Sequence, residues 1–275
     1  MSPHLAFILL LAVKMAVAAT FVTVATVSAE KFGPAVGALV ATLPVSAGPA
    51  YVFLALDHDA AFISAGAVTS LALNVATALY AIVYVLLAQR QPFWICFPVA
   101  FATWLVIALL LGRIAWTTWS AVLLNIVVFP ICFFISRPFR HVRVRPMKRR
   151  WYDFVIRAGM VACLVATVVT LSFHIGPSGT GVLAAFPVIY TSVMVLMHPR
   201  VGGPAAAAVL ASAVPGLAGF GAALLTLHLT AVPLGSAAAL ILALVVSVVW
   251  NLALYLTHRR NAPVAVTRPS SPPSA

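Results

Sequence analysis

The chain has 275 residues, of which 64% are apolar and only 7% are charged. Soluble domains carry about 25% charged residues, so a soluble fold could not hide this much apolar surface, and lipid must be the solvent. The net charge of +12 would suit a nucleic-acid partner. The distribution of the basic residues along the chain explains the charge without one, so we expect no nucleic-acid partner.

We expect an all-α integral membrane protein of about nine spans, because a spanning helix needs about 20 mostly apolar residues. The predicted spans are 5–28, 34–56, 60–88, 92–111, 115–136, 151–173, 179–197, 204–230 and 234–257. The first span ends in Val27-Ser28-Ala29, which resembles a signal-peptidase site. No basic residue precedes this apolar run and Lys14 lies within it, so we expect the segment to be retained.

Nine spans place the two termini on opposite sides of the membrane. Thirteen of the 16 lysines and arginines then lie on the side of the C-terminus, seven of them in the basic loop 137–150. The positive-inside rule makes that side cytoplasmic and leaves the N-terminus outside. The loop would also attract acidic headgroups, so membrane lipids are expected partners. The Pro- and Ser-rich segment 259–275 is expected to be a disordered cytoplasmic tail.

A shift of 143 residues aligns the two halves of the sequence. The motif GPAVGALVATLP at 33–44 falls on GPSGTGVLAAFP at 176–187, and Lys14 falls on Arg157. Five spans separate the two repeat starts, so the second copy would cross the membrane in the opposite direction, as in many secondary transporters. The expected units are a four-helix repeat at 1–112, a linking helix at 113–136, the basic loop at 137–150, an inverted four-helix repeat at 151–258 and the tail at 259–275.

Pro44 and Pro187 are expected to break spans two and seven, because proline removes one helical hydrogen bond. The freed backbone groups need a neighbour, water or a ligand, since lipid offers no partner. Such broken helices form the midplane substrate site of inverted-repeat transporters. The alternative is a packing kink that binds nothing. Asn74, Asn125 and Asn251 lie in other spans, where an amide usually bonds a neighbouring helix.

Two cations, Lys14 and Arg157, lie inside predicted spans, where a charge is costly. The four acidic residues all lie near span ends, so neither cation has an evident partner. An anionic substrate would supply one; alternatively, the side chains snorkel to the interface, or a neutral lysine takes part in proton coupling. The predicted substrate-binding residues are Lys14, Thr42, Pro44, Ser46, Arg157, Pro187, Tyr190 and Thr191.

The sequence carries none of the common catalytic motifs, such as HExxH, GxSxG or the P-loop. We therefore expect no enzyme, no catalytic residue, no metal and no cofactor. The run Asp57-His58-Asp59 contains metal-ligating residue types, but adjacent residues on a helix do not converge on one ion. We interpret it as a solvated loop on the outer face.

Lys14 with LVATLP (39–44), and Arg157 with VLAAFP (182–187), resemble the small GlpM-like bacterial inner-membrane proteins, with one such unit in each half. The resemblance implies a bacterial inner-membrane protein of the transporter or permease kind, and brings no substrate with it. The function expected is transport of a small anion or an anionic amphiphile. The alternative is a non-transporting scaffold or assembly factor that docks partners on the basic loop.

Overall fold

The computed structural model describes residues 3–31, 47–141 and 150–260, and all the regular elements in these ranges are helices. The short 3-10 helix η1 (Arg137–His141) follows α6. The α-helices are α1 (Pro3–Lys31), α3 (Ala47–Asp57), α4 (Ala60–Leu87), α5 (Phe93–Leu111), α6 (Thr118–Ser136), α7 (Trp151–Ala184), α8 (Val188–Val201), α9 (Gly203–Leu234) and α10 (Ser236–Arg260).

Seven of these helices are long and apolar enough to cross a membrane, which fits a multi-pass membrane protein. The expectation of nine full spans is not met in the described part of the chain. Helix α3 has 11 residues and α8 has 14, both below the length of a span. The predicted span 179–197 is wrong in its bounds, because the chain stays helical to Ala184 and resumes at Val188.

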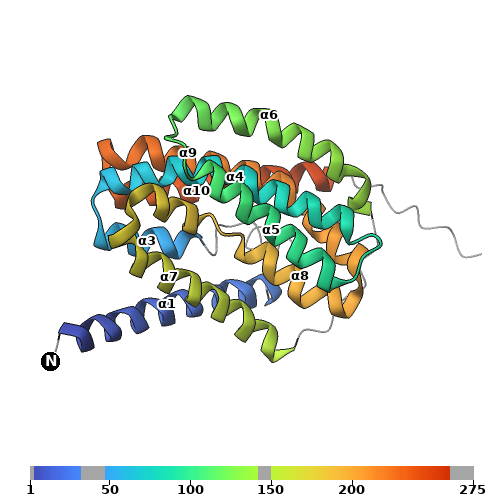
Figure 1. Ribbon diagram of the computed structural model, residues 1–275, viewed down its shortest axis with the longest axis horizontal. Coiled ribbons are helices and arrows are strands. Elements are labelled where there is room, and N and C mark those ends of the chain that lie inside the picture. The colour runs from blue at the N-terminus through green and yellow to red at the C-terminus, as the bar shows by residue number, and fades with distance from the viewer. Residues whose placement is uncertain (1–2, 32–46, 142–149, 261–275) are drawn as a thin grey trace, which may run out of the picture.

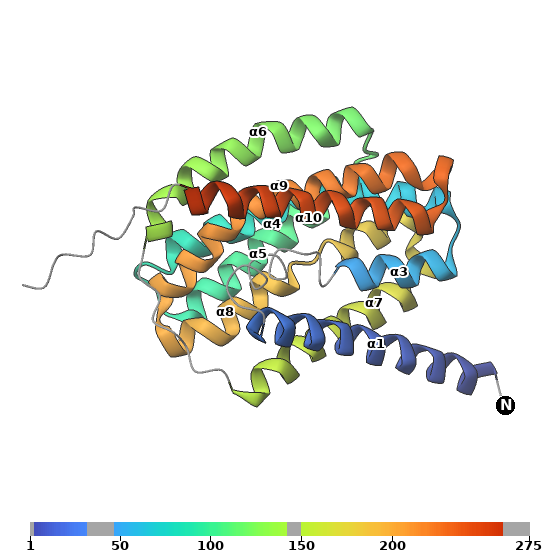
Figure 2. The ribbon, with the colours of Figure 1, turned by 180° about the vertical axis from the view of Figure 1, so that it is seen from behind.

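Helix α4 is the centre of the structure. It packs against α5, α6, α7 and α9, and its buried residues cover all of its faces. A helix that is apolar and buried all round is typical of the core of a membrane bundle. Helices α1, α5, α6 and α10 instead expose many large apolar side chains, which suit contact with lipid tails. In both views α6 lies along one edge of the molecule and α1 along the opposite edge (Figures 1 and 2).

Helices α4 and α9 pack antiparallel along most of their length. Ser64 bonds the backbone of His228 near the start of α4, Asn74 Nδ2 donates to Leu217 O at 2.9 Å near its middle, and Gly203 lies against Ala88 at its end. Asn125 of α6 joins the same region by donating to Leu71 O at 2.8 Å. The prediction that asparagines bond neighbouring helices is confirmed for Asn74 and Asn125.

Helix α7 contains a sharp change of direction at Gly176. This residue has φ 70°, a conformation that favours glycine because a Cβ would clash with the backbone. The predicted boundary between spans six and seven falls at this residue. The residues after it run alongside α4, where Ser70 Oγ donates to Gly181 O at 2.7 Å.

The predicted break at Pro187 is present, as the gap between α7 and α8. Val188 N donates to Phe186 O at 2.9 Å across Pro187, whose φ of −81° and ψ of 64° are those of an inverse γ-turn. Ala185 O, which is freed by the break, accepts from Thr77 Oγ1 of α4 at 3.3 Å. A neighbouring helix therefore satisfies this part of the broken backbone. Pro44 lies outside the described residues.

Gly181 allows α7 to approach α4 closely, because a Cβ at this position would overlap the carbonyl oxygen of Gly66. We expect Gly181→Ala to lower the free energy of unfolding by about 1–3 kcal/mol, the usual effect of overpacking. Gly159 of the same helix has no atom within 4 Å of such a Cβ. Gly159→Ala is thus the control and should be neutral or stabilising by up to about 1 kcal/mol. Melting temperatures of the purified variants test this, and equal values would contradict the close contact.

Candidate functional site

Lys14 forms an ion pair with Asp57 inside the protein. Lys14 Nζ lies 2.6 Å from both carboxylate oxygens of Asp57, and the side chains of the pair are 7% and 15% exposed. The prediction that Lys14 lacks an acidic partner is wrong. The snorkelling alternative stays a prediction for Lys14, whose ammonium is buried against the carboxylate at the end of α3. Burial of both charges requires such pairing, since an isolated charge in an apolar interior is very costly.

The local sequence places Asp57 at this position. Helix α3 ends at Asp57, the chain turns at His58, and Asp59 caps α4 by accepting a hydrogen bond from Phe62 N at 2.8 Å. Aspartate is a favoured N-cap residue because its side chain satisfies a free helical amide. Asp59 is exposed, as expected for a loop, but Asp57 points to α1. The interpretation of this whole run as a solvated loop is wrong for Asp57.

His58 lies between the two aspartates and contacts α7. Its Nε2 is 2.8 Å from Ser172 Oγ, which itself donates to Val169 O, so we assign the proton of this contact to the imidazole. Its ring stacks on Phe62 at a centroid distance of 3.8 Å. Burial lowers the pKa of His58, the charge of Lys14 adds to this effect, and the two neighbouring aspartates oppose it.

The ion pair lines one cavity, and a second cavity lies further along α1 and α3. The small cavity, of about 80 Å³, is lined by Lys14 and Asp57 together with Phe7, Leu10, Leu11, Val169 and Phe173. The apolar pocket, of about 300 Å³, lies between α1, α3, α9 and α10. Its volume is at the lower end of the range typical of ligand sites.

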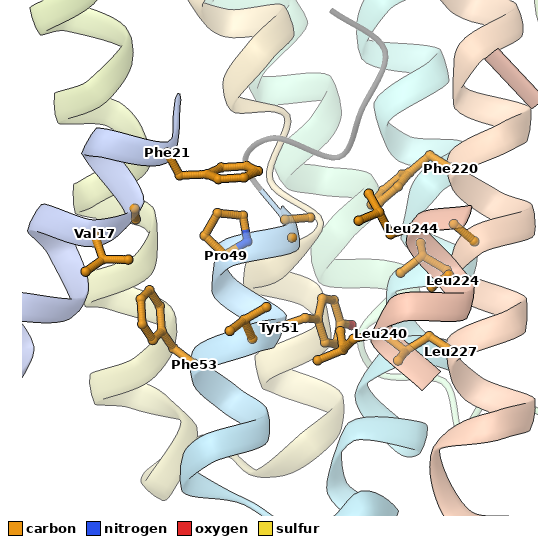
Figure 3. A pocket seen from close by; sticks show the side chains of 16 residues that line it. Val17, Phe21, Pro49, Tyr51, Phe53, Phe220, Leu224, Leu227, Leu240 and Leu244 are labelled. Atoms are coloured by element: carbon orange, nitrogen blue, oxygen red, sulfur yellow. The ribbon is translucent and has the colours of Figure 1, made fainter. Parts of the chain in front are cut away.

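Apolar side chains line the larger pocket almost entirely. Val17 and Phe21 of α1 lie on one side, Phe220 and Leu224 of α9 lie on the other, and α3 with Phe53 stands between them (Figure 3). Tyr51 also lines the pocket, and its hydroxyl lies 2.6 Å from Ser70 Oγ of α4. The chemistry of the lining suits a hydrocarbon chain or ring and offers little to a fully hydrated small ion.

The ion pair lies about one helical turn from the lining of the apolar pocket. Lys14 is three and four residues before the pocket-lining Val17 and Ala18, and Asp57 is four residues after Phe53. Residues three or four apart share one face of a helix, about 5–6 Å apart. Lys14 therefore lines the small cavity and is followed, one turn further along α1, by residues that line the apolar pocket.

A second ion pair joins α7 to the end of α8. Arg200 Nη1 lies 2.9 Å from Asp153 Oδ2, and Arg200 Nη2 contacts the other carboxylate oxygen. Arg157, one turn further along α7, acts electrostatically on the same carboxylate. The expectation that Arg157 has no acidic group nearby is therefore wrong. This pair lies near the end of α4 and the first pair lies near its start, about 40 Å apart by helix length.

The remaining predicted site residues are only partly brought together. Thr191 Oγ1 lies 2.9 Å from the Tyr80 hydroxyl and is buried, as is Tyr190. None of the five described candidates (Lys14, Arg157, Pro187, Tyr190, Thr191) lines the apolar pocket. Thr42, Pro44 and Ser46 lie outside the described residues. Binding of substrate by these side chains stays a prediction.

The described residues contain no group of three or more His, Cys, Asp or Glu that could hold a metal ion. The sequence reasoning missed Asp57 as a partner of Lys14, although one signal was present. Asp57 is 143 residues before Arg200, which is the same offset that separates Lys14 from Arg157. Lys14 and Asp57 of the first pair thus correspond to Arg157 and Arg200. Asp153, the partner of Arg200, lies one turn from Arg157.

Comparison with known proteins gives no relatives: no family matches the sequence, and no curated protein or solved structure is detectably similar.

The ion pair should behave as a coupled unit. We expect Lys14→Met or Asp57→Leu alone to lower the free energy of unfolding by about 3–5 kcal/mol, because each leaves one buried charge unpaired. The double variant should recover most of this loss, since two apolar side chains can replace a buried pair at little cost. Melting temperatures of the three variants in detergent give the comparison. A double variant whose loss equals the sum of the single losses would show that the two residues act independently.

His58 should make stability depend on pH. Because its pKa is lowered in the folded state, the unfolded chain binds this proton more tightly. The stabilisation is therefore present above about pH 6.5 and is lost as pH falls below it. We expect the melting temperature to fall between about pH 7 and pH 5 in the native protein, and to fall less in His58→Gln. Parallel pH profiles of the two proteins would contradict this role.

Proposed function

We propose that the protein is a membrane transporter or permease for an amphiphile with an apolar tail and an anionic head. The observation that carries the proposal is the apolar pocket that lies about one helical turn from the Lys14–Asp57 pair. A purely structural ion pair would not need a cavity of about 300 Å³ beside it. The lining favours the amphiphile over a small hydrated anion, because few polar groups there could replace water.

The position of the pocket supports a transport role. It is lined by α1 and α3 from the first half of the chain and by α9 and α10 from the second. In alternating access, two halves rock against each other around a central site. A ligand held between these helices would contact both halves.

The proposed mechanism uses the two halves as inverted repeats. Asn74 and Leu217, which bond each other, are related by the same 143-residue offset as the sequence motifs. Residues on a two-fold axis contact their own equivalents, so this contact is expected if the axis passes between α4 and α9. The two ion pairs at opposite ends of α4 also fit this arrangement, with Asp57 and Arg200 at equivalent positions.

The experiment fills the apolar pocket with a larger side chain and measures both the binding and the transport of a probe. Ala243 lines the pocket, whereas Ala237 of the same helix is exposed to the lipid side. With decanesulfonate as the probe, we expect Ala243→Phe to weaken binding at least about tenfold, or about 1.4 kcal/mol. Ala237→Phe should bind as the native protein does.

Uptake of labelled decanesulfonate into proteoliposomes separates transport from binding alone. We expect uptake above that of protein-free vesicles, reduced by Ala243→Phe and unchanged by Ala237→Phe. Binding without uptake would contradict a transporter and favour the scaffold. Equal binding of decanesulfonate by both variants would show that it does not bind in the apolar pocket.

A further inference from the structure

The Lys14–Asp57 pair poses an electrostatic problem for an anionic ligand. The pair is neutral as a whole and lines a small, otherwise apolar cavity, so an anion that enters next to it brings a net negative charge into an apolar site. An unpaired charge in such a site is strongly disfavoured. A binding site for an anion must therefore gain a positive charge or lose a negative one.

We propose, on the basis of the proposed function above, that the anionic head replaces Asp57 at Lys14 and that Asp57 takes up one proton as it leaves. The Lys14 ammonium keeps its charge and exchanges one anionic partner for another. The Asp57 carboxylate becomes a neutral carboxylic acid, which tolerates the apolar surroundings. One proton and one anion then enter together, and the site stays neutral throughout. The protein is thus a proton–anion symporter whose coupling residue is Asp57.

The geometry provides for each part of this exchange. Lys14 lines the small cavity, where its ammonium can bond an anionic head, and Val17 and Ala18 of the apolar pocket follow one turn further along α1. Asp57 lines the small cavity, which gives its carboxyl group a space outside the pocket. Both side chains are on helix positions one turn from the pocket lining, so a head at Lys14 and a tail in the pocket belong to neighbouring turns of the same helices.

The titratable groups around Asp57 limit the alternatives. Lys14 faces it from α1, and His58 and Asp59 follow it in the chain. The residues of α7 that line the same small cavity are Val169 and Phe173, which do not titrate. His58 and Asp59 are therefore the neighbouring groups that could take up the proton instead, and each is tested by a variant of its own.

The test measures protons taken up on binding of decanesulfonate to the full chain in nanodiscs of zwitterionic lipid. The sulfonate head stays charged between about pH 5 and pH 8, so any proton goes to the protein. We expect one proton per bound molecule in a weakly buffered solution. Uptake of one proton per bound molecule means that affinity should rise about tenfold for each unit that the pH falls. Decanol, with the same chain and a neutral head, should bind without proton uptake.

Three variants identify the residue that takes up the proton. Asp57→Asn resembles the protonated residue and should bind decanesulfonate with no proton uptake and no dependence on pH. Asp59→Asn, which keeps an N-cap residue for α4, and His58→Gln should both keep the uptake. If Asp57→Asn does not fold, the proton count on the native protein and on His58→Gln still decides the question.

The outcomes distinguish the coupling to a proton from the binding of ligand in the pocket. Binding that Ala243→Phe abolishes, but that takes up no proton, would overturn the coupling and leave the proposed function standing. Loss of uptake in His58→Gln would assign the proton to His58 and overturn the role of Asp57. An absence of decanesulfonate binding to the native protein would overturn both.

Discussion

Lipid offers no hydrogen bond and no counter-charge, and the rest of this structure depends on that constraint. The described chain is helical because a helix satisfies its own backbone. Where the helix is broken between Ala184 and Val188, the Thr77 hydroxyl of α4 donates to the freed carbonyl of Ala185. Where a charge is buried, an opposite charge lies against it, as Asp57 lies against Lys14. The charges of the two ion pairs and the Ala185 carbonyl are thus each matched by a specific partner.

The same constraint explains why α4 carries so many small polar side chains although it is the most buried helix. Its Ser64, Ser70, Asn74 and Thr77 bond groups of α7 or α9. In a membrane, apolar packing alone does not hold helices together, because lipid tails are equally apolar. Hydrogen bonds and close contacts at glycine supply the specificity that fixes α7 and α9 against α4.

The break at Pro187 and the pocket at the Lys14–Asp57 pair have different energetic characters. At the break, the side chain of Thr77 satisfies the freed carbonyl of Ala185. The pocket is an apolar cavity about one helical turn from a charged pair, so an amphiphile bound there would find apolar contacts for its tail and a cation near its head. This contrast favours the junction of α1 and α3, rather than the broken helix of the second half, as the place where the proposed ligand binds.

The sequence by itself determined the solvent, the helical class and most of the long spans, because apolar composition and span length are properties of local stretches. It also predicted the break at Pro187, since proline acts on its own helix. Only the tertiary structure decided which groups meet. The pairing of Lys14 with Asp57, which are 43 residues apart, depends on how α1 packs beside α3. The pocket likewise lies between four helices from both ends of the chain, and no local sequence pattern predicts a cavity between distant helices.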